Sequence, residues 1–179
     1  KTPLEITNIH LNGSIVTNLY GGSNETGNVT TSNITVSNGK ATNVYGGNNI
    51  GGTTSESKII LNGGEITTLY GGGKLTSTPN TYITSNNSKV GTIYGGGEQS
   101  STTNTNININ NGIIGNIYGG SNITGEVETS NIKVYGGSIT TIYGGNNVGG
   151  TLNKANLEIT GANIDTIYGG GNNAIVSTA

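Results

Sequence analysis

Seven tyrosines recur at nearly constant spacing and are the residues best suited to binding a ligand. Each begins a Tyr-Gly-Gly tripeptide, 24 or 25 residues from the next: Tyr20, Tyr45, Tyr70, Tyr94, Tyr118, Tyr143 and Tyr168. If the rings point outward, they form an aromatic ladder that could stack on sugar rings or on another fibril. If they point inward, they fill the core of a chain that has no Phe, Trp or Met. The sequence leaves both alternatives open.

Residues for catalysis or metal binding are scarce. Nine acidic residues, only one of them Asp, stand against seven Lys, and the chain has no Arg and no Cys. Glu126 and Glu128 could form a carboxylate pair, but they lie in the least regular part of the repeat. The only histidine, His10, lies between Ile9 and Leu11 and is predicted to point outward into solvent. We therefore predict no enzymatic activity, no metal and no cofactor.

Charge and hydropathy also limit the partners. The net charge is −2, and the lysines do not cluster at the density of a surface that tracks phosphates, so we do not expect nucleic acid to bind. The segment contains no apolar run long enough to span a membrane.

Aliphatic residues recur at fixed distances from each tyrosine and predict the elements that position it. The residue before the tyrosine is always Leu, Val or Ile, and the residue eleven before is always Ile or Leu. Aliphatic and polar residues alternate over 34–36, 107–109 and 132–134, a period of two that is typical of β-strands. Helix is excluded because each interior glycine would cost it about 1 kcal/mol. Gly and Asn pairs such as Asn38-Gly39 lie between the two strands of a unit, where we expect positive φ.

The recurrence of the same residue type every 24 or 25 positions favours stacked coils over side-by-side hairpins. If one unit is one coil, each residue lies on its equivalent in the next coil. The sequence therefore predicts an all-β fold, a parallel β-helix (β-solenoid) of about seven rungs of 24–25 residues, right-handed and with about three faces per coil. The irregular face after Tyr-Gly-Gly is predicted to hold the loop.

A second level of order links blocks of four coils. Successive spacings of 25, 25, 24 and 24 residues give a super-repeat of 98 residues, in which 23–27 corresponds to 121–125 and 48–52 to 146–150. We interpret residues 1–179 as a single repeat array and, because the block is duplicated, as a segment of a longer array. One corner is predicted to carry an amide ladder of Asn24, Asn49, Asn122, Asn147 and Asn172.

The repeated pattern Ile/Val-x-Ile/Val-x-Gly-Gly-x-Ile-x-x-Ile-Tyr-Gly-Gly resembles the parallel β-helix repeats of bacterial surface adhesins, the pectate-lyase-like adhesive solenoids of large cell-wall proteins. The resemblance covers the whole chain. It implies an extracellular, structural or adhesive rod at a cell surface, acting as stalk, adhesin or filament subunit. We also expect self-association by end-to-end stacking, since the open ends of a solenoid need a cover.

Other functions of such solenoids give the alternatives. The first is a glycan-binding module in which the seven tyrosines contact a surface glycan. The second is an ice-binding solenoid that uses the threonines three residues before the tyrosine, although Gly91, Gly115 and Asp165 interrupt that column. The third is a segment of a phage tail fibre.

Overall fold

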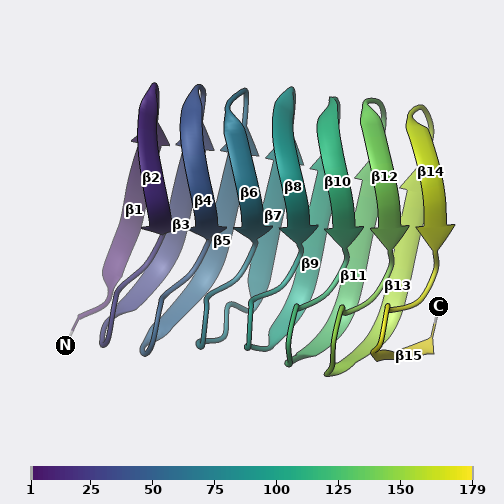
Figure 1. The fold of residues 1–179 in the computed structure, drawn as a ribbon. Coiled ribbons are helices and arrows are strands. Elements are labelled where there is room, and N and C mark those ends of the chain that lie inside the picture. Colours follow the sequence, from purple (N-terminus) through teal and green to yellow (C-terminus); the bar gives the residue numbers. More distant parts are fainter. Residues whose placement is uncertain (1, 179) are drawn as a thin grey trace.

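The computed structural model describes residues 2–178, which form fifteen strands and no helix. Sheet A contains β1 (Leu4–Leu11), β3 (Asn28–Val36), β5 (Thr53–Leu61), β7 (Asn80–Ser85), β9 (Thr102–Ile109), β11 (Glu126–Val134), β13 (Thr151–Ile159) and β15 (Ile175–Thr178). Sheet B contains β2 (Ser14–Tyr20), β4 (Gly39–Tyr45), β6 (Glu65–Tyr70), β8 (Ser88–Tyr94), β10 (Gly112–Tyr118), β12 (Ser138–Tyr143) and β14 (Asn163–Tyr168). The chain passes from one sheet to the other in every coil (Figure 1).

Every strand pairs in parallel with the equivalent strand of the next coil, in the register that the repeat predicts. Ile34, for example, pairs with Ile9 on one side and Ile59 on the other. In Figure 1 the strands of sheet B run downward in front and those of sheet A upward behind, while the chain advances from left to right, so the coil is right-handed. The predicted β-solenoid of about seven coils is therefore confirmed.

The coil has two sheets rather than three regular faces. The segment after Tyr-Gly-Gly consists of bends, and it is ordered by backbone hydrogen bonds to the previous coil, such as Ile50 N–H to the Asn24 oxygen at 2.8 Å. This segment lacks the alternation of polar and apolar residues that a sheet with one buried face requires. It is the predicted loop, and it forms the whole of the third side.

The main core lies between the sheets and consists of stacked aliphatic side chains. Ile34, Ile59, Ile83, Ile107 and Ile132 of sheet A form one fully buried column. The aliphatic residues that precede the tyrosines in sheet B, from Leu19 to Ile142, form a second column in the same cluster. Since each coil repeats the same contacts, a few branched aliphatic residues per coil suffice to build a continuous core.

Positive φ is confined to glycine over residues 2–178, which refines the expectation that Asn would share it. Gly39 and Gly112, which begin β4 and β10 directly after the turn between the two strands of their units, have φ of 113° and 138°. The preceding Asn38 and Asn111 contribute side chains instead, each accepting the glycine N–H at 2.9 Å. Asparagine therefore caps the turn, while glycine supplies its backbone conformation.

Candidate functional site: the tyrosine column

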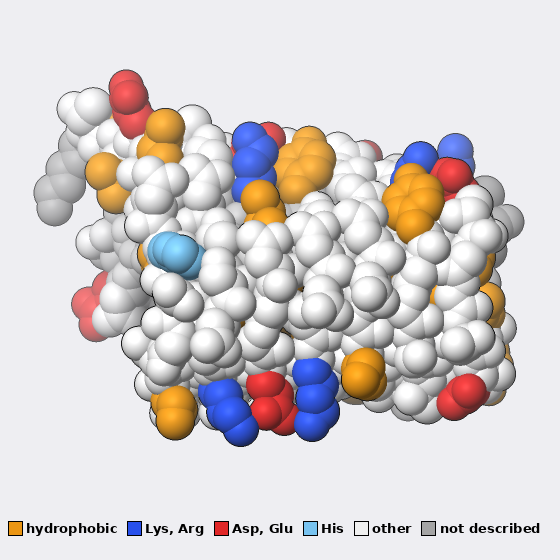
Figure 2. Space-filling model, turned by 90° about the horizontal axis from the view of Figure 1, so that it is seen from above, with side chains coloured by type: hydrophobic (Ala, Val, Ile, Leu, Met, Phe, Trp, Pro, Cys, Tyr) orange, Lys and Arg blue, Asp and Glu red, His pale blue; other side chains and the backbone are white. Residues whose placement is uncertain are grey.

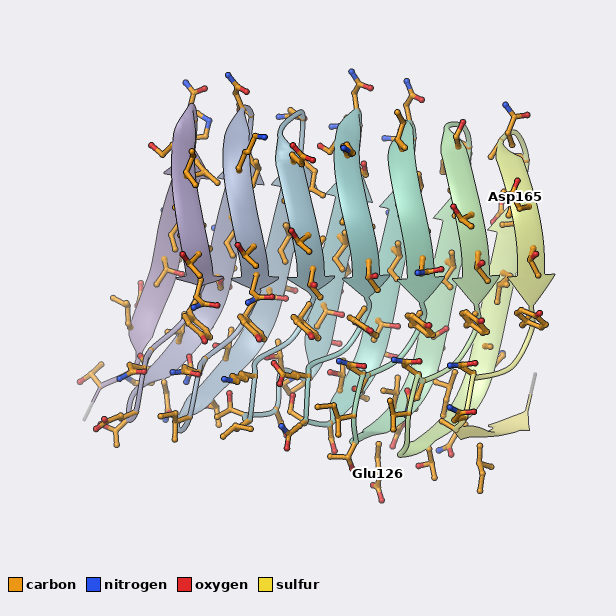
Figure 3. All side chains as sticks on the ribbon, viewed as in Figure 1. Glu126 and Asp165 are labelled. Atoms are coloured by element: carbon orange, nitrogen blue, oxygen red, sulfur yellow. The ribbon has the colours of Figure 1, made fainter. Side chains whose placement is uncertain are left out.

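The seven repeated tyrosines end the seven strands of sheet B and form one continuous stack. Neighbouring ring centroids lie 4.7–5.0 Å apart and ring planes differ by 2–14°. The separation equals the spacing of strands in a sheet, because each ring is carried by the same position of successive coils. In Figure 3 the rings form a row along the ends of the sheet B strands.

The middle of the stack is buried. Tyr45, Tyr70, Tyr94 and Tyr118 are only 3–8% exposed, Tyr20 and Tyr143 are partly buried, and Tyr168 in the last coil is half exposed. Each ring covers the face of the next, so sugar rings could reach the faces only at the ends of the stack. The sequence left open whether the rings form an exposed ladder or are buried, and in the structure the middle rings are buried.

The tyrosines form a cluster of their own, separate from the aliphatic core. Tyr70 and the preceding Leu69 are both buried, but in different clusters. Strand alternation is therefore kept: Leu69 faces the other sheet, whereas Tyr70 faces the opposite way and is covered by the loop segments.

The glycine after each tyrosine leaves room for the next coil rather than supplying positive φ. A Cβ on Gly46 would lie 2.0 Å from the Gly71 oxygen, and a Cβ on Gly71 would lie 2.2 Å from the Gly95 oxygen. The same glycine oxygens accept hydrogen bonds from a hydroxyl column in sheet A, for example Thr81 Oγ1 to Gly95 at 2.7 Å. These bonds fix the end of sheet B to the strand of sheet A fourteen residues earlier.

Side chains from two coils later bind the hydroxyls of three of the four buried tyrosines. Tyr45 donates to the carboxylate of Glu98, while Asn122 and Asn147 donate to the hydroxyls of Tyr70 and Tyr94 at 3.2 and 3.3 Å. Burial raises the pKa of all four buried tyrosines, and the Glu98 carboxylate raises the pKa of Tyr45 further. The rings are thus held as neutral phenols, and each bridge spans three coils.

The predicted amide ladder is present at the loop corner. Asn49 donates to Asn24 at 2.7 Å, Asn147 to Asn122 at 2.9 Å and Asn172 to Asn147 at 3.0 Å. Lys74 and Glu98 occupy the equivalent positions in the two shorter coils and interrupt the ladder. Its members bond to one another along the axis, as a structural role requires.

Two further asparagines, Asn48 and Asn146, are the key loop residues that the sequence analysis missed. Both are fully buried and lie 98 residues apart. Asn48 accepts hydrogen bonds from Ser23 N–H and Thr54 Oγ1 and donates to the oxygens of Gly27 and Gly51. The detectable signal was the 98-residue super-repeat itself, because only the longer coils that carry Gly-Gly at 51–52 or 149–150 have an asparagine here.

The candidate carboxylates and the histidine do not assemble into a catalytic site. Glu126 and Glu128 lie two residues apart on β11, both exposed, beside a shallow groove with Pro79 and Ser101. Figure 3 shows Glu126 at the loop edge and Asp165 on β14, well separated along the coil. His10 is exposed, as predicted, and its Nε2 lies 2.8 Å from Ser37 Oγ. Over the described residues, no three His, Asp or Glu side chains come close enough to hold a metal.

Charged residues lie in a few small groups on a mostly uncharged surface, as Figure 2 shows for one face. Glu65 bridges Lys40 and Lys89 at 3.0 and 2.9 Å, and the hydrogen bonds from these lysines lower the pKa of Glu65 to about 2. Residues 2–178 include no helix of the length and hydropathy needed to cross a membrane.

The architecture therefore defines a parallel β-solenoid with a buried tyrosine stack. No protein-family model, curated protein or solved structure matches the chain.

Proposed function

We propose that the chain is a structural rod at a cell surface, serving as the stalk of an adhesin or as a filament subunit rather than as a catalyst. The observation that supports this most is the unbroken stacking of equivalent residues through every coil. Backbone ladders, aliphatic columns and the tyrosine stack all run along the same axis. With strands about 4.8 Å apart, the length of such a rod grows in proportion to the number of coils, and seven coils measure roughly 30 Å.

The terminal coils expose residues whose equivalents are buried elsewhere. Ile167 on β14 is 47% exposed, whereas Ile142 and Ile117, one and two coils earlier, are 0% exposed. At the other end, Leu4 on β1 is 56% exposed, whereas its equivalent one coil later, Val29, is 1% exposed. An uncovered strand edge with apolar neighbours favours pairing with a further coil. We propose that another copy, stacked end to end, can provide that coil.

Sedimentation velocity over a range of concentrations tests end-to-end stacking. We expect the 179-residue chain to self-associate and Ile167→Lys to reduce that association. Ile113→Lys is the matched control, because Ile113 is exposed on the side of sheet B rather than at an end. A chain that stays monomeric at high concentration, or one that both variants affect equally, would contradict the end-to-end arrangement.

Antibody labelling of the source cells tests the location. Antibodies against the folded chain should label intact cells, and mild protease treatment of those cells should remove the label. Labelling only after permeabilisation would contradict a role at the surface.

A further inference from the structure

Two tyrosines, Tyr82 and Tyr135, lie outside the repeated column, and their side chains belong to neither core cluster. The sequence has nine tyrosines, and the repeat accounts for seven. Tyr82 is 39% exposed on β7, and Tyr135, which follows β11 directly, is 47% exposed. Both side chains lie on the outer face of sheet A, on the side away from the core.

Neither position carries an aromatic residue in any other coil. The residues equivalent to Tyr82 are Asn8, Asn33, Lys58, Asn106, Asn131 and Asn156. The residues equivalent to Tyr135 include Asn62, Asn86, Asn110 and Thr160. Like Tyr135, each follows a sheet A strand and donates its backbone N–H to the oxygen of the last residue of the preceding sheet A strand. Two independent departures from the repeat therefore place large exposed rings on one face.

The two rings stand at opposite corners of one groove. The groove has a volume of about 450 Å³ and is lined by Tyr82, Asn106, Asn108, Asn131, Lys133 and Tyr135 among others. Tyr82 pairs with Asn106 on β9. The N–H of Tyr135 bonds to the Ile109 oxygen at 2.8 Å, which places Tyr135 beside Asn110, the residue directly after β9. The rings are two strands apart and four residues apart along a strand, which places their Cα atoms roughly 16 Å apart.

The floor of the groove is polar and almost uncharged. Asn108 lies at its centre, between Thr84 and Lys133, and its side chain makes no hydrogen bond to any residue within 2–178. The amide of Asn108 therefore has donors and an acceptor to offer. Lys133, the one charged residue of the floor, is paired with Glu158 at 2.9 Å.

We propose that this groove binds a neutral oligosaccharide. Sugar rings present C–H groups on their faces and hydroxyls at their edges, so they can stack on the two tyrosines while their hydroxyls bond to the asparagine amides. One sugar ring cannot reach both tyrosines, so the ligand is a chain of several sugars. The near-neutral floor disfavours a polyanion, since the only lysine in it is already paired. The site adds recognition to the rod and is independent of end-to-end stacking.

The test is an array that carries neutral oligosaccharides of glucose, galactose, mannose and N-acetylglucosamine, with heparin oligosaccharides and single-stranded DNA as anionic probes. We expect the 179-residue chain to bind at least one neutral class. Calorimetry with that oligosaccharide should show affinity reduced by about tenfold or more in Tyr82→Ala and in Tyr135→Ala, because exposed aromatic anchors dominate such interfaces. Tyr82→Phe should keep most of the affinity, and Asn108→Ala should lose part of it.

Ile113→Ala, which truncates an exposed side chain on sheet B, is the matched control and should bind as the unchanged chain does. Circular dichroism should show all variants folded, because none of these side chains lies in either core cluster. The proposal is overturned if no neutral oligosaccharide binds, if both alanine variants bind normally, or if only the anionic probes bind and Lys133→Gln abolishes that binding. None of these outcomes bears on the sedimentation or labelling results.

Discussion

The carboxamide oxygen of Asn48 accepts a hydrogen bond from the backbone N–H of Ser23, in the preceding coil, at 2.7 Å. This contact holds the loop of one coil against the loop of the next. The same side chain also satisfies the Thr54 hydroxyl and two glycine oxygens inside a fully buried pocket. One asparagine thus replaces the water that these polar groups would otherwise need.

Asn48→Ala should therefore destabilise the protein strongly. The variant leaves several buried polar groups without partners, and we expect a loss of about 2–4 kcal/mol in the free energy of unfolding, measured by urea denaturation. The matched control is Asn49→Ala, which removes a partly exposed ladder bond to Asn24 and should cost less than about 1 kcal/mol. Equal losses in the two variants would contradict the assigned role of Asn48.

The glycine that follows each tyrosine should tolerate no side chain inside the stack. Gly71→Ala places a methyl group 2.2 Å from the Gly95 oxygen, and the rigid backbone of the next coil cannot move away. We expect a loss of about 3 kcal/mol or a failure to fold, seen by thermal unfolding. In the last described coil, a Cβ on Gly169 meets nothing within 4 Å, so Gly169→Ala should fold normally. A stable Gly71→Ala protein would show that the coils are not closely packed at this position.

The buried tyrosines should make the protein sensitive to alkali. Burial raises their pKa above the ordinary value of 10.0, so they stay protonated in the folded chain while the unfolded chain ionises. Their contribution is complete below about pH 10, and it is lost as the pH rises further, by about 1.4 kcal/mol per pH unit for each tyrosine. Urea denaturation between pH 8 and 12 measures the slope. Tyr94→Phe should lower the slope by the contribution of about one tyrosine, because burial raises the pKa of Tyr94 strongly. A variant with an unchanged slope would argue against this cause.

The Lys40–Glu65–Lys89 group should contribute a small, salt-sensitive stabilisation. The pKa of Glu65 is lowered from 4.5 to about 2, so its contribution is present at neutral pH and is lost as the pH falls between these values. Glu65→Gln should lower the thermal midpoint slightly at low salt, and the difference should disappear in about 1 M salt, because the pair is exposed and screened. A difference that persists in high salt would indicate packing rather than charge.

The sequence was sufficient to predict the coil, the parallel register and the inward aliphatic columns. Residues such as Ile34 and Ile59 fill the same core position in successive coils, so the same residue type recurs at the repeat spacing. It could not place the tyrosine rings. Alternation puts Tyr70 on the side of sheet B opposite Leu69, which suggests exposure, whereas its cover comes from Asn122, two coils later. Contacts that span 52 residues lie beyond any local pattern.

The loop residues were hidden for a related reason. Asn48 and Asn49 are adjacent and chemically identical, yet one is fully buried and the other belongs to the exposed ladder. What separates them is Gly22 in the preceding coil, where a Cβ would lie 1.8 Å from Asn48 Oδ1. To predict from the sequence that Asn48 is buried, one must know which residue of the preceding coil faces it, as well as the length of each coil.

Gly120 faces Asn146 in the same way, with a Cβ position 1.7 Å from Asn146 Oδ1, and lies 98 residues after Gly22. A gene carrying this array could therefore recombine with itself between the two positions and gain or lose four coils while keeping a glycine opposite the buried asparagine. A shift of one coil would bring Gly22 against a position that holds glycine, leaving a void where the asparagine belongs. The rod can thus change its length during evolution in steps of four coils, each step keeping the match between the loop glycine and the buried asparagine.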